Sequence, residues 1–203
     1  MLRALRYGLW ALLAALSVTM VGKFFDRETT TKISDLPAQS SPIGAPFQLI
    51  DHRGSPITQQ AMEGRPAAVF FGFTHCPEIC PTTLYELANW LDILGVDGMD
   101  LNVFFITVDP VRDTPQIMKE YVERFSARIK GITGEPGEIT KLLKAWHVYA
   151  KRVPLADGEY TMDHTASIYL LRTNGSLHGM IGYQDTTDIA LKKLRGLLSL
   201  HSS

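Results

Sequence analysis

The chain has 203 residues, of which 45% are hydrophobic and 20% are charged, and its formal net charge is −1. This composition is typical of a globular protein. It excludes a basic nucleic-acid-binding surface, because the chain has no run of lysines and arginines, so we expect no nucleic-acid partner.

The first 25 residues form a separate segment. Residues 7–22 carry no charge and follow two arginines, and a helix continued to Phe25 is long enough to cross the hydrocarbon core of a bilayer. A cleaved signal peptide has a similar layout, but residues 17–23 match an Ala-x-Ala cleavage site poorly. We therefore predict an N-terminal transmembrane anchor at 1–25, with a cleaved signal as the alternative. Either segment sends the rest of the chain into a compartment where disulfides persist.

The remaining residues divide into a tether and one domain. Residues 26–45 are rich in Ser, Thr and Pro, which is typical of a tether, and residues 46–203 are long enough to bury one full core. Hydrophobic periodicity in this domain predicts, in chain order, a hairpin at 47–58, a buried strand at 66–73, a helix at 81–94, a buried strand at 103–108, a helix at 115–125, an extended segment at 130–133, a helix at 138–146, a strand at 149–153, a hairpin of strands at 167–171 and 177–183, and a helix at 187–200. This order predicts an α/β fold that is thioredoxin-like, with a mixed sheet flanked by helices on both faces.

The only two cysteines, Cys76 and Cys80, follow the first long buried strand. Pro81 lacks an N–H and disfavours helical angles at Cys80, which predicts a turn over 76–80 and a helix that Pro81 opens. Both sulfurs then face free N–H groups at a helix amino terminus, where the thiolate is favoured. A thiolate of low pKa suits disulfide exchange and binding of a soft metal alike, so this placement leaves both functions open.

The spacing of the cysteines narrows the chemistry. Three intervening residues let two thiolates converge on one ion, and such soft ligands suit copper, whereas structural zinc normally needs four ligands. A disulfide closing so short a ring is feasible and readily reduced. Two further functions are disfavoured. A peroxidase would need a threonine where Phe73 stands, and a purely structural disulfide would stabilise a core of this size little.

A third metal ligand would be a histidine, and the chain has six of them: His52, His75, His147, His164, His178 and His201. We favour His164, because it lies just before a predicted sheet strand, where thioredoxin-like folds bring a loop against the cysteine turn. His75 adjoins Cys76, but it points elsewhere if the strand alternation continues that far. For each histidine the alternative is an ordinary surface or hydrogen-bonded residue.

Three segments together resemble the Sco/SenC family of copper-binding, thioredoxin-fold assembly proteins. They are Phe-Thr-His-Cys-Pro-Glu-Ile-Cys-Pro at 73–81, Val-Asp-Pro-Val-Arg-Asp-Thr-Pro at 108–115 and Asp-His-Thr at 163–165. The resemblance covers nearly all of residues 43–200. Glu78 and Val111 depart from the Asp and Glu that we associate with the family, and neither is a ligand position.

The resemblance implies that Cys76, Cys80 and His164 bind copper, as Cu(I), Cu(II) or both, and that the two cysteines form a redox-active pair that cycles to a disulfide. It also implies that the client is the dinuclear copper site on subunit II of cytochrome c oxidase. In segment 109–114 we favour a structural role, a strand end followed by a helix cap, with Arg112 and Asp113 as alternative partner contacts.

The leading hypothesis is a copper chaperone with a single-pass anchor in the inner membrane and its soluble domain in the periplasm. Its expected partners are subunit II of cytochrome c oxidase, other copper chaperones and thiol–disulfide reductants. The alternative is a thiol–disulfide oxidoreductase that reduces the cysteines of an exported client. His164 discriminates the two, because only metal binding needs the imidazole.

Overall fold

A computed structural model describes residues 44–156 and 158–201. The predicted anchor at 1–25 and most of the predicted tether at 26–45 lie outside the described residues. Within the described part, no helix is long and apolar enough to span a membrane.

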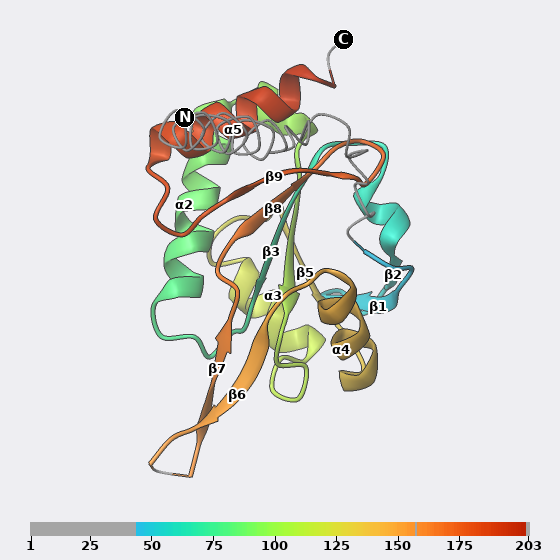
Figure 1. Cartoon of the computed structure of the whole chain (residues 1–203), viewed down its shortest axis with the longest axis vertical. Helices are drawn as coiled ribbons and strands as arrows, with labels where there is room; N and C mark the ends of the chain where they lie inside the picture. Colours follow the sequence, from blue (N-terminus) through green and yellow to red (C-terminus); the bar gives the residue numbers. More distant parts are fainter. Residues whose placement is uncertain (1–43, 157, 202–203) are drawn as a thin grey trace, which may run out of the picture. The chain divides into compact units, whose positions relative to one another are not determined.

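Seven strands of the described residues form one mixed sheet in the order β2-β1-β5-β4-β3-β8-β9 (Figure 1). The three central strands are parallel to one another, and β1 and β8, which flank them, are antiparallel. The central strands are β3 (Ala67–Gly72), β4 (Asn102–Thr107) and β5 (Ile129–Thr133), and the outer strands are β1 (Gln48–Asp51), β2 (Pro56–Thr58), β8 (Ile168–Leu171) and β9 (Leu177–Ile181).

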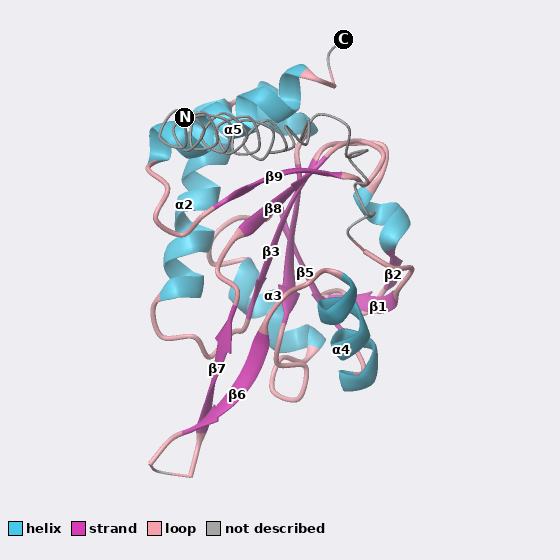
Figure 2. Cartoon of the chain, in the orientation of Figure 1, coloured by secondary structure: helices cyan, strands magenta, loops and turns pink. Residues whose placement is uncertain are grey.

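Helices cover both faces of this sheet (Figure 2). Tyr121 of α3 packs on Phe105 of β4 at 5.6 Å on one face, whereas Trp146, directly after α4, packs on Phe71 of β3 at 5.3 Å on the other. The helices are α2 (Ile79–Leu94), α3 (Pro115–Val122), α4 (Pro136–Ala145) and α5 (Thr187–Ser199), with the short 3-10 helices η2 (Gln59–Met62) and η3 (Asp97–Asp100). The predicted thioredoxin-like arrangement of a mixed sheet and flanking helices is confirmed.

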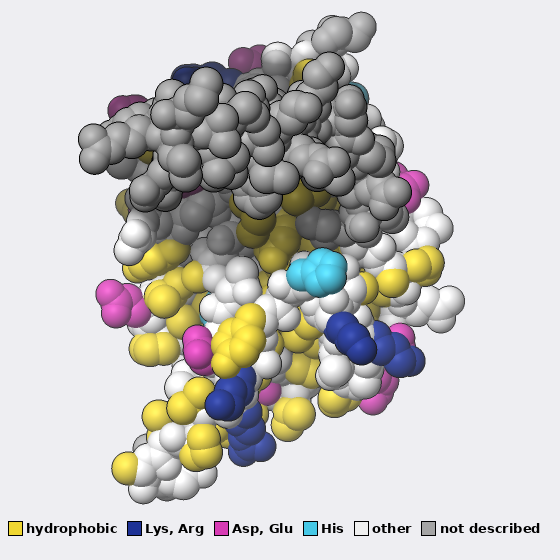
Figure 3. Space-filling model, in the orientation of Figure 1, with side chains coloured by type: hydrophobic (Ala, Val, Ile, Leu, Met, Phe, Trp, Pro, Cys, Tyr) yellow, Lys and Arg dark blue, Asp and Glu magenta, His cyan; other side chains and the backbone are white. Residues whose placement is uncertain are grey.

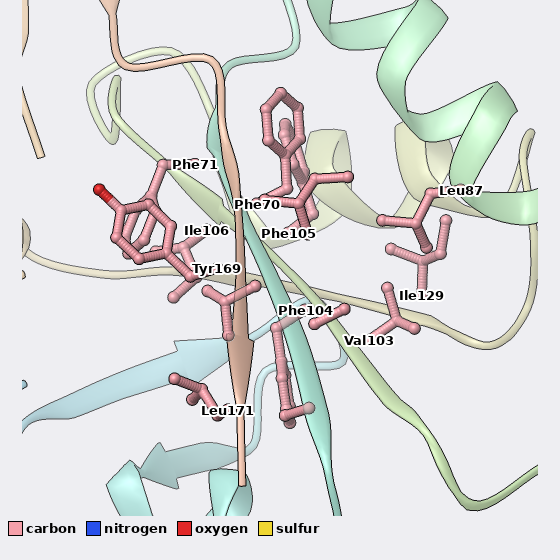
Figure 4. Close-up of a cluster of buried hydrophobic side chains, with 14 of the residues drawn as sticks. Phe70, Phe71, Leu87, Val103, Phe104, Phe105, Ile106, Ile129, Tyr169 and Leu171 are labelled. Atoms are coloured by element: carbon pink, nitrogen blue, oxygen red, sulfur yellow. The ribbon is translucent and has the colours of Figure 1, made fainter. Parts of the chain in front are cut away.

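The core lies on both faces of β3 and β4. Every residue of β3 is buried, as expected for a parallel strand that is covered on both sides. Phe70 packs on Phe105 at 5.9 Å on one face, and Phe71 packs on Tyr169 at 5.5 Å on the opposite face (Figure 4). The carboxyl end of β3, at Gly72, is therefore a firmly packed base for the cysteine segment that follows it.

A second sheet consists of the antiparallel hairpin β6 (Ala150–Pro154) and β7 (Tyr160–His164), which projects from the body of the domain (Figures 1 and 3). The strand predicted at 149–153 corresponds to β6. The prediction of a loop at His164 is wrong, because this residue ends β7 and pairs with Ala150. Residues 160–164 alternate between Tyr, Met and His on one face and Thr and Asp on the other, a strand pattern that the prediction of a loop overlooked.

The helix that follows the cysteines begins earlier than predicted. It starts at Ile79, so Cys80 and Pro81 both lie in its first turn. Proline is accommodated there because the N–H groups of a first turn have no acceptor within the helix. Two other local predictions are confirmed. The helix cap expected in segment 109–114 is Thr114, which accepts from the Ile117 N–H at 3.4 Å, and the turn of the hairpin predicted at 167–183 contains Gly175 with a positive φ of 75°.

Candidate metal centre

Three donor groups from separate parts of the chain converge at one end of the sheet. The sulfurs of Cys76 and Cys80 and one ring nitrogen of His164 all lie within 4.8 Å of one another. Cys80 Sγ lies 3.5 Å from His164 Nε2. Among the described residues, this is the one cluster of three or more histidine, cysteine or acidic side chains whose donor atoms could meet on one ion.

Cys80 is the buried member of the cluster, with a side chain that is 0% exposed. Its sulfur lies directly against the backbone of Gly72. A Cβ at position 72 would stand 2.8 Å from Cys80 Sγ and 2.7 Å from Cε2 of Phe105. Only glycine therefore leaves room for this sulfur. The sequence did not reveal this requirement, because a glycine near the end of an apolar strand is not unusual by itself.

Cys76 is half-buried and lies in front of the amino terminus of α2. The Cys80 backbone N–H donates to Cys76 Sγ at 3.4 Å, as expected for a thiolate at a helix start. Donation from the Cys80 thiol lowers the pKa of Cys76 to about 4, with backbone N–H groups acting in the same direction against the effect of burial. The same hydrogen bond, together with burial, raises the pKa of Cys80. At neutral pH the pair is thus one accessible thiolate beside one buried thiol.

His164 is oriented by its own backbone neighbourhood. Its Nδ1 lies 3.0 Å from the carbonyl oxygen of Thr165, which can only accept, so Nδ1 carries the proton. The unprotonated Nε2 then faces Cys80, which is the tautomer that a metal ligand needs. The ring also meets Phe73 edge-on at 5.7 Å. The imidazole is therefore positioned with its lone pair toward the sulfurs.

Asp113 holds the segment that leads into Cys76. Its carboxylate accepts from the Thr74 hydroxyl at 2.6 Å, from the Thr74 N–H at 3.1 Å and from the Thr107 hydroxyl at 2.6 Å. Burial raises the pKa of Asp113 despite these bonds, and its residue exposure is 0%. The alternative of Asp113 as a partner contact is therefore wrong, because no partner can reach it, and its role is to fix the cysteine loop.

The hairpin that carries His164 is fastened to the loop between β4 and α3. The Tyr160 hydroxyl donates to Asp109 Oδ1 at 2.9 Å, and Arg112 Nη1 donates to the Tyr160 carbonyl at 2.9 Å. Arg112 also stacks on the Tyr160 ring at 3.7 Å and pairs with Asp109. Tyr160 was not singled out from the sequence, since no local pattern links it to residues some fifty positions earlier.

The other histidines do not join the cluster. His75 is half-exposed and its Nδ1 lies 3.0 Å from the Thr74 hydroxyl, away from the sulfurs, as expected from strand alternation. His52 is buried and accepts from the Gly131 N–H at 2.9 Å. His147 adopts a positive φ of 53° after α4, and burial lowers the pKa of His178 on β9. The sixth, His201, is exposed at the end of the described chain.

Two solved structures resemble this architecture over most of its length. Bradyrhizobium japonicum ScoI with copper bound is 44% identical and superimposes with a TM-score of 0.71, covering 76% of this chain and 99% of that one. Yeast Sco1 with copper bound is 32% identical with a TM-score of 0.72, covering 77% and 88% respectively.

Sequence comparison points to the same group of proteins. The SCO2-like protein RP587 of Rickettsia prowazekii is 38% identical over 135 residues, which are 66% of this chain and 66% of that protein. The chain spans between 40% and 60% of the length of the mitochondrial relatives that it matches. The SCO1/SenC family model matches residues 36–199. The chain therefore belongs to the SCO1/SenC family.

Proposed function

We propose that the chain binds copper through Cys76, Cys80 and His164 and delivers it to a client protein. The observation that carries this proposal is the convergence of two sulfurs and one imidazole nitrogen within 4.8 Å. Two thiolates and one imidazole are soft to borderline donors, and they suit Cu(I), which accepts low coordination numbers. The two copper-bound relatives described above support the same metal.

The unequal cysteines suit loading and release. The Cys76 thiolate is accessible and ionised, so it meets an incoming ion first. Binding of the ion at Cys80 displaces the proton of the buried thiol, because a cysteine ligand must be deprotonated. His164 Nε2 completes the site without losing a proton, since Nδ1 holds it. Release reverses these steps, because the ligands of the client replace Cys76, Cys80 and His164 one at a time.

The client in this proposal is the dinuclear copper site on subunit II of cytochrome c oxidase, the expectation that accompanies the family resemblance. An anchor at 1–25 and a tether at 26–45 would hold the domain 46–203 in the periplasm beside such a membrane-bound client. Other copper chaperones would load the site, and a thiol–disulfide reductant would keep the two cysteines reduced.

A second candidate function is the reduction of a client disulfide. The low pKa of Cys76 beside a buried thiol favours it. The Cys76 thiolate attacks one sulfur of the client disulfide and displaces the other as a thiolate. Cys80 then gives its proton to the displaced client thiolate and attacks Cys76 Sγ. This releases the second client sulfur as a thiolate, which takes a proton from water, and leaves a Cys76–Cys80 disulfide.

Copper titration of the full chain tests the ligand set. We expect thiolate-to-copper charge-transfer absorption in the wild type, and its loss in Cys76→Ser, Cys80→Ser and His164→Ala. Retention in His164→Ala would remove the histidine from the site. The two functions separate in the same variant: if His164→Ala keeps the dithiol reduction potential but no longer delivers copper, metal transfer is the function. If client reduction and copper delivery both survive in His164→Ala, disulfide exchange is the function.

A further inference from the structure

A methionine lies between two anchored residues on the inner face of β7. In the β6–β7 register, Tyr160, Met162 and His164 pair with Pro154, Arg152 and Ala150. Alternate residues of a strand point to the same face, so the side chains of Tyr160, Met162 and His164 share one face. The rise of a strand separates the Cα atoms of Met162 and His164 by about 7 Å.

Contacts of the two flanking residues fix the direction of that face. Tyr160 bonds to Asp109 and stacks on Arg112, whereas His164 meets Cys80. Arg112 and His164 also approach one common ring, that of Phe73, at 5.8 Å and 5.7 Å. Met162 stands between them and therefore faces the segment that runs from Phe73 to Cys80.

The burial of Met162 agrees with this direction. Its side chain is half-buried and packs against the core, as does that of Cys76. The neighbouring Asp163, which points to the other face of the hairpin, is exposed. A long, flexible thioether thus lies on the same face of β7 as the His164 imidazole, one alternate position along the strand, and its side chain is partly accessible.

We propose that the Met162 thioether is a further ligand for Cu(I) at this centre. The inference rests on the proposed copper site and deepens it. A thioether is a soft, neutral donor that needs no deprotonation and prefers Cu(I) to Cu(II). It holds the ion when Cys76 or His164 gives way to a client's ligand, so one bond is exchanged at a time and copper keeps its oxidation state. It also raises the reduction potential of the bound copper.

The direct test is X-ray absorption at the copper edge of the full chain, labelled with selenomethionine and loaded with Cu(I) under reducing, oxygen-free conditions. Selenium is a heavier scatterer than sulfur, so it distinguishes a thioether ligand from the two thiolates. We expect a copper–selenium contribution in the wild type, although the chain has seven methionines, because only a bound one appears. It is expected to vanish in Met162→Leu and to persist in Met180→Leu, a matched half-buried methionine on the edge strand β9.

Copper bound without any copper–selenium contribution in the wild type would overturn the inference and leave the three-ligand site intact. A contribution that persists in Met162→Leu would also overturn it. If the wild type takes up no Cu(I), the copper site itself fails, and Met162 as a ligand fails with it. Leucine conserves the volume of methionine, so unchanged circular dichroism and thermal unfolding of the variant are expected. In a competition assay, Met162→Leu is expected to lose about tenfold in Cu(I) affinity, comparable to the loss of a residue that supports a ligand.

Discussion

An alanine at position 72 would collide with the sulfur of Cys80. Its Cβ would stand 2.8 Å from Sγ, whereas non-bonded heavy atoms attract only from about 3.5 Å. The sulfur must therefore retreat by about 0.7 Å, and Phe105, which is 2.7 Å from the same Cβ, blocks relaxation of the opposite wall. Metal–ligand distances tolerate about 0.2 Å, so this displacement is enough to break the alignment of Cys80 with His164.

Two measurements follow from this geometry. Overpacking of a tight core costs about 1–3 kcal/mol, which lowers the melting temperature of a domain of this size by about 2–12 °C. Copper affinity, measured by competition with a chromophoric chelator, is expected to fall by about tenfold or more. Gly179→Ala on β9 is the matched control, since nothing lies within 4 Å of its Cβ position, and it should leave both values unchanged. If Gly72→Ala melts and binds copper like the wild type, the proposed role of Gly72 is wrong.

Three further predictions concern the groups around the cluster. Tyr160→Phe removes the hydroxyl bond to Asp109 and should destabilise the domain by about 1–2 kcal/mol in chemical denaturation while weakening copper binding; wild-type affinity would show that this bond does not position the hairpin. Asp113→Asn turns one acceptor oxygen into a donor that faces other donors, so a loss of about 1–3 kcal/mol is expected, and an unchanged unfolding midpoint would contradict the anchoring role. Alkylation of Cys76 should proceed at nearly the same rate at pH 6 and pH 8, because its thiolate forms as the pH rises through about 4. An ordinary thiol would react roughly a hundredfold faster at pH 8 than at pH 6. If the rate rises in this way in Cys80→Ser but not in the wild type, the hydrogen bond between the two cysteines causes the low pKa of Cys76.

Local signals in the chain were sufficient for much of the fold. The apolar run before Cys76 identified β3, helical periodicity identified α2, α4 and α5, and the helix cap expected in segment 109–114 identified the start of α3. Hydrophobic periodicity, helix capping and turn residues each depend on side chains only a few positions apart, so they can be recognised in the sequence. The proximity of two cysteines to a helix start was predictable for the same reason.

What the amino-acid sequence determined by itself was the identity of the donors and the order of the elements. The tertiary structure alone decided the placement of the His164 strand against the cysteines, the burial of Asp113, the contact of Gly72 with Cys80, and the division of the pair into a half-buried thiolate and a buried thiol. Each of these depends on atoms brought together by packing across the sheet, between residues that are up to 88 positions apart, from Cys76 to His164. Hydrophobic periodicity carries no information about such contacts, because the burial of a side chain and its distance from residues far along the chain depend on how the whole domain folds.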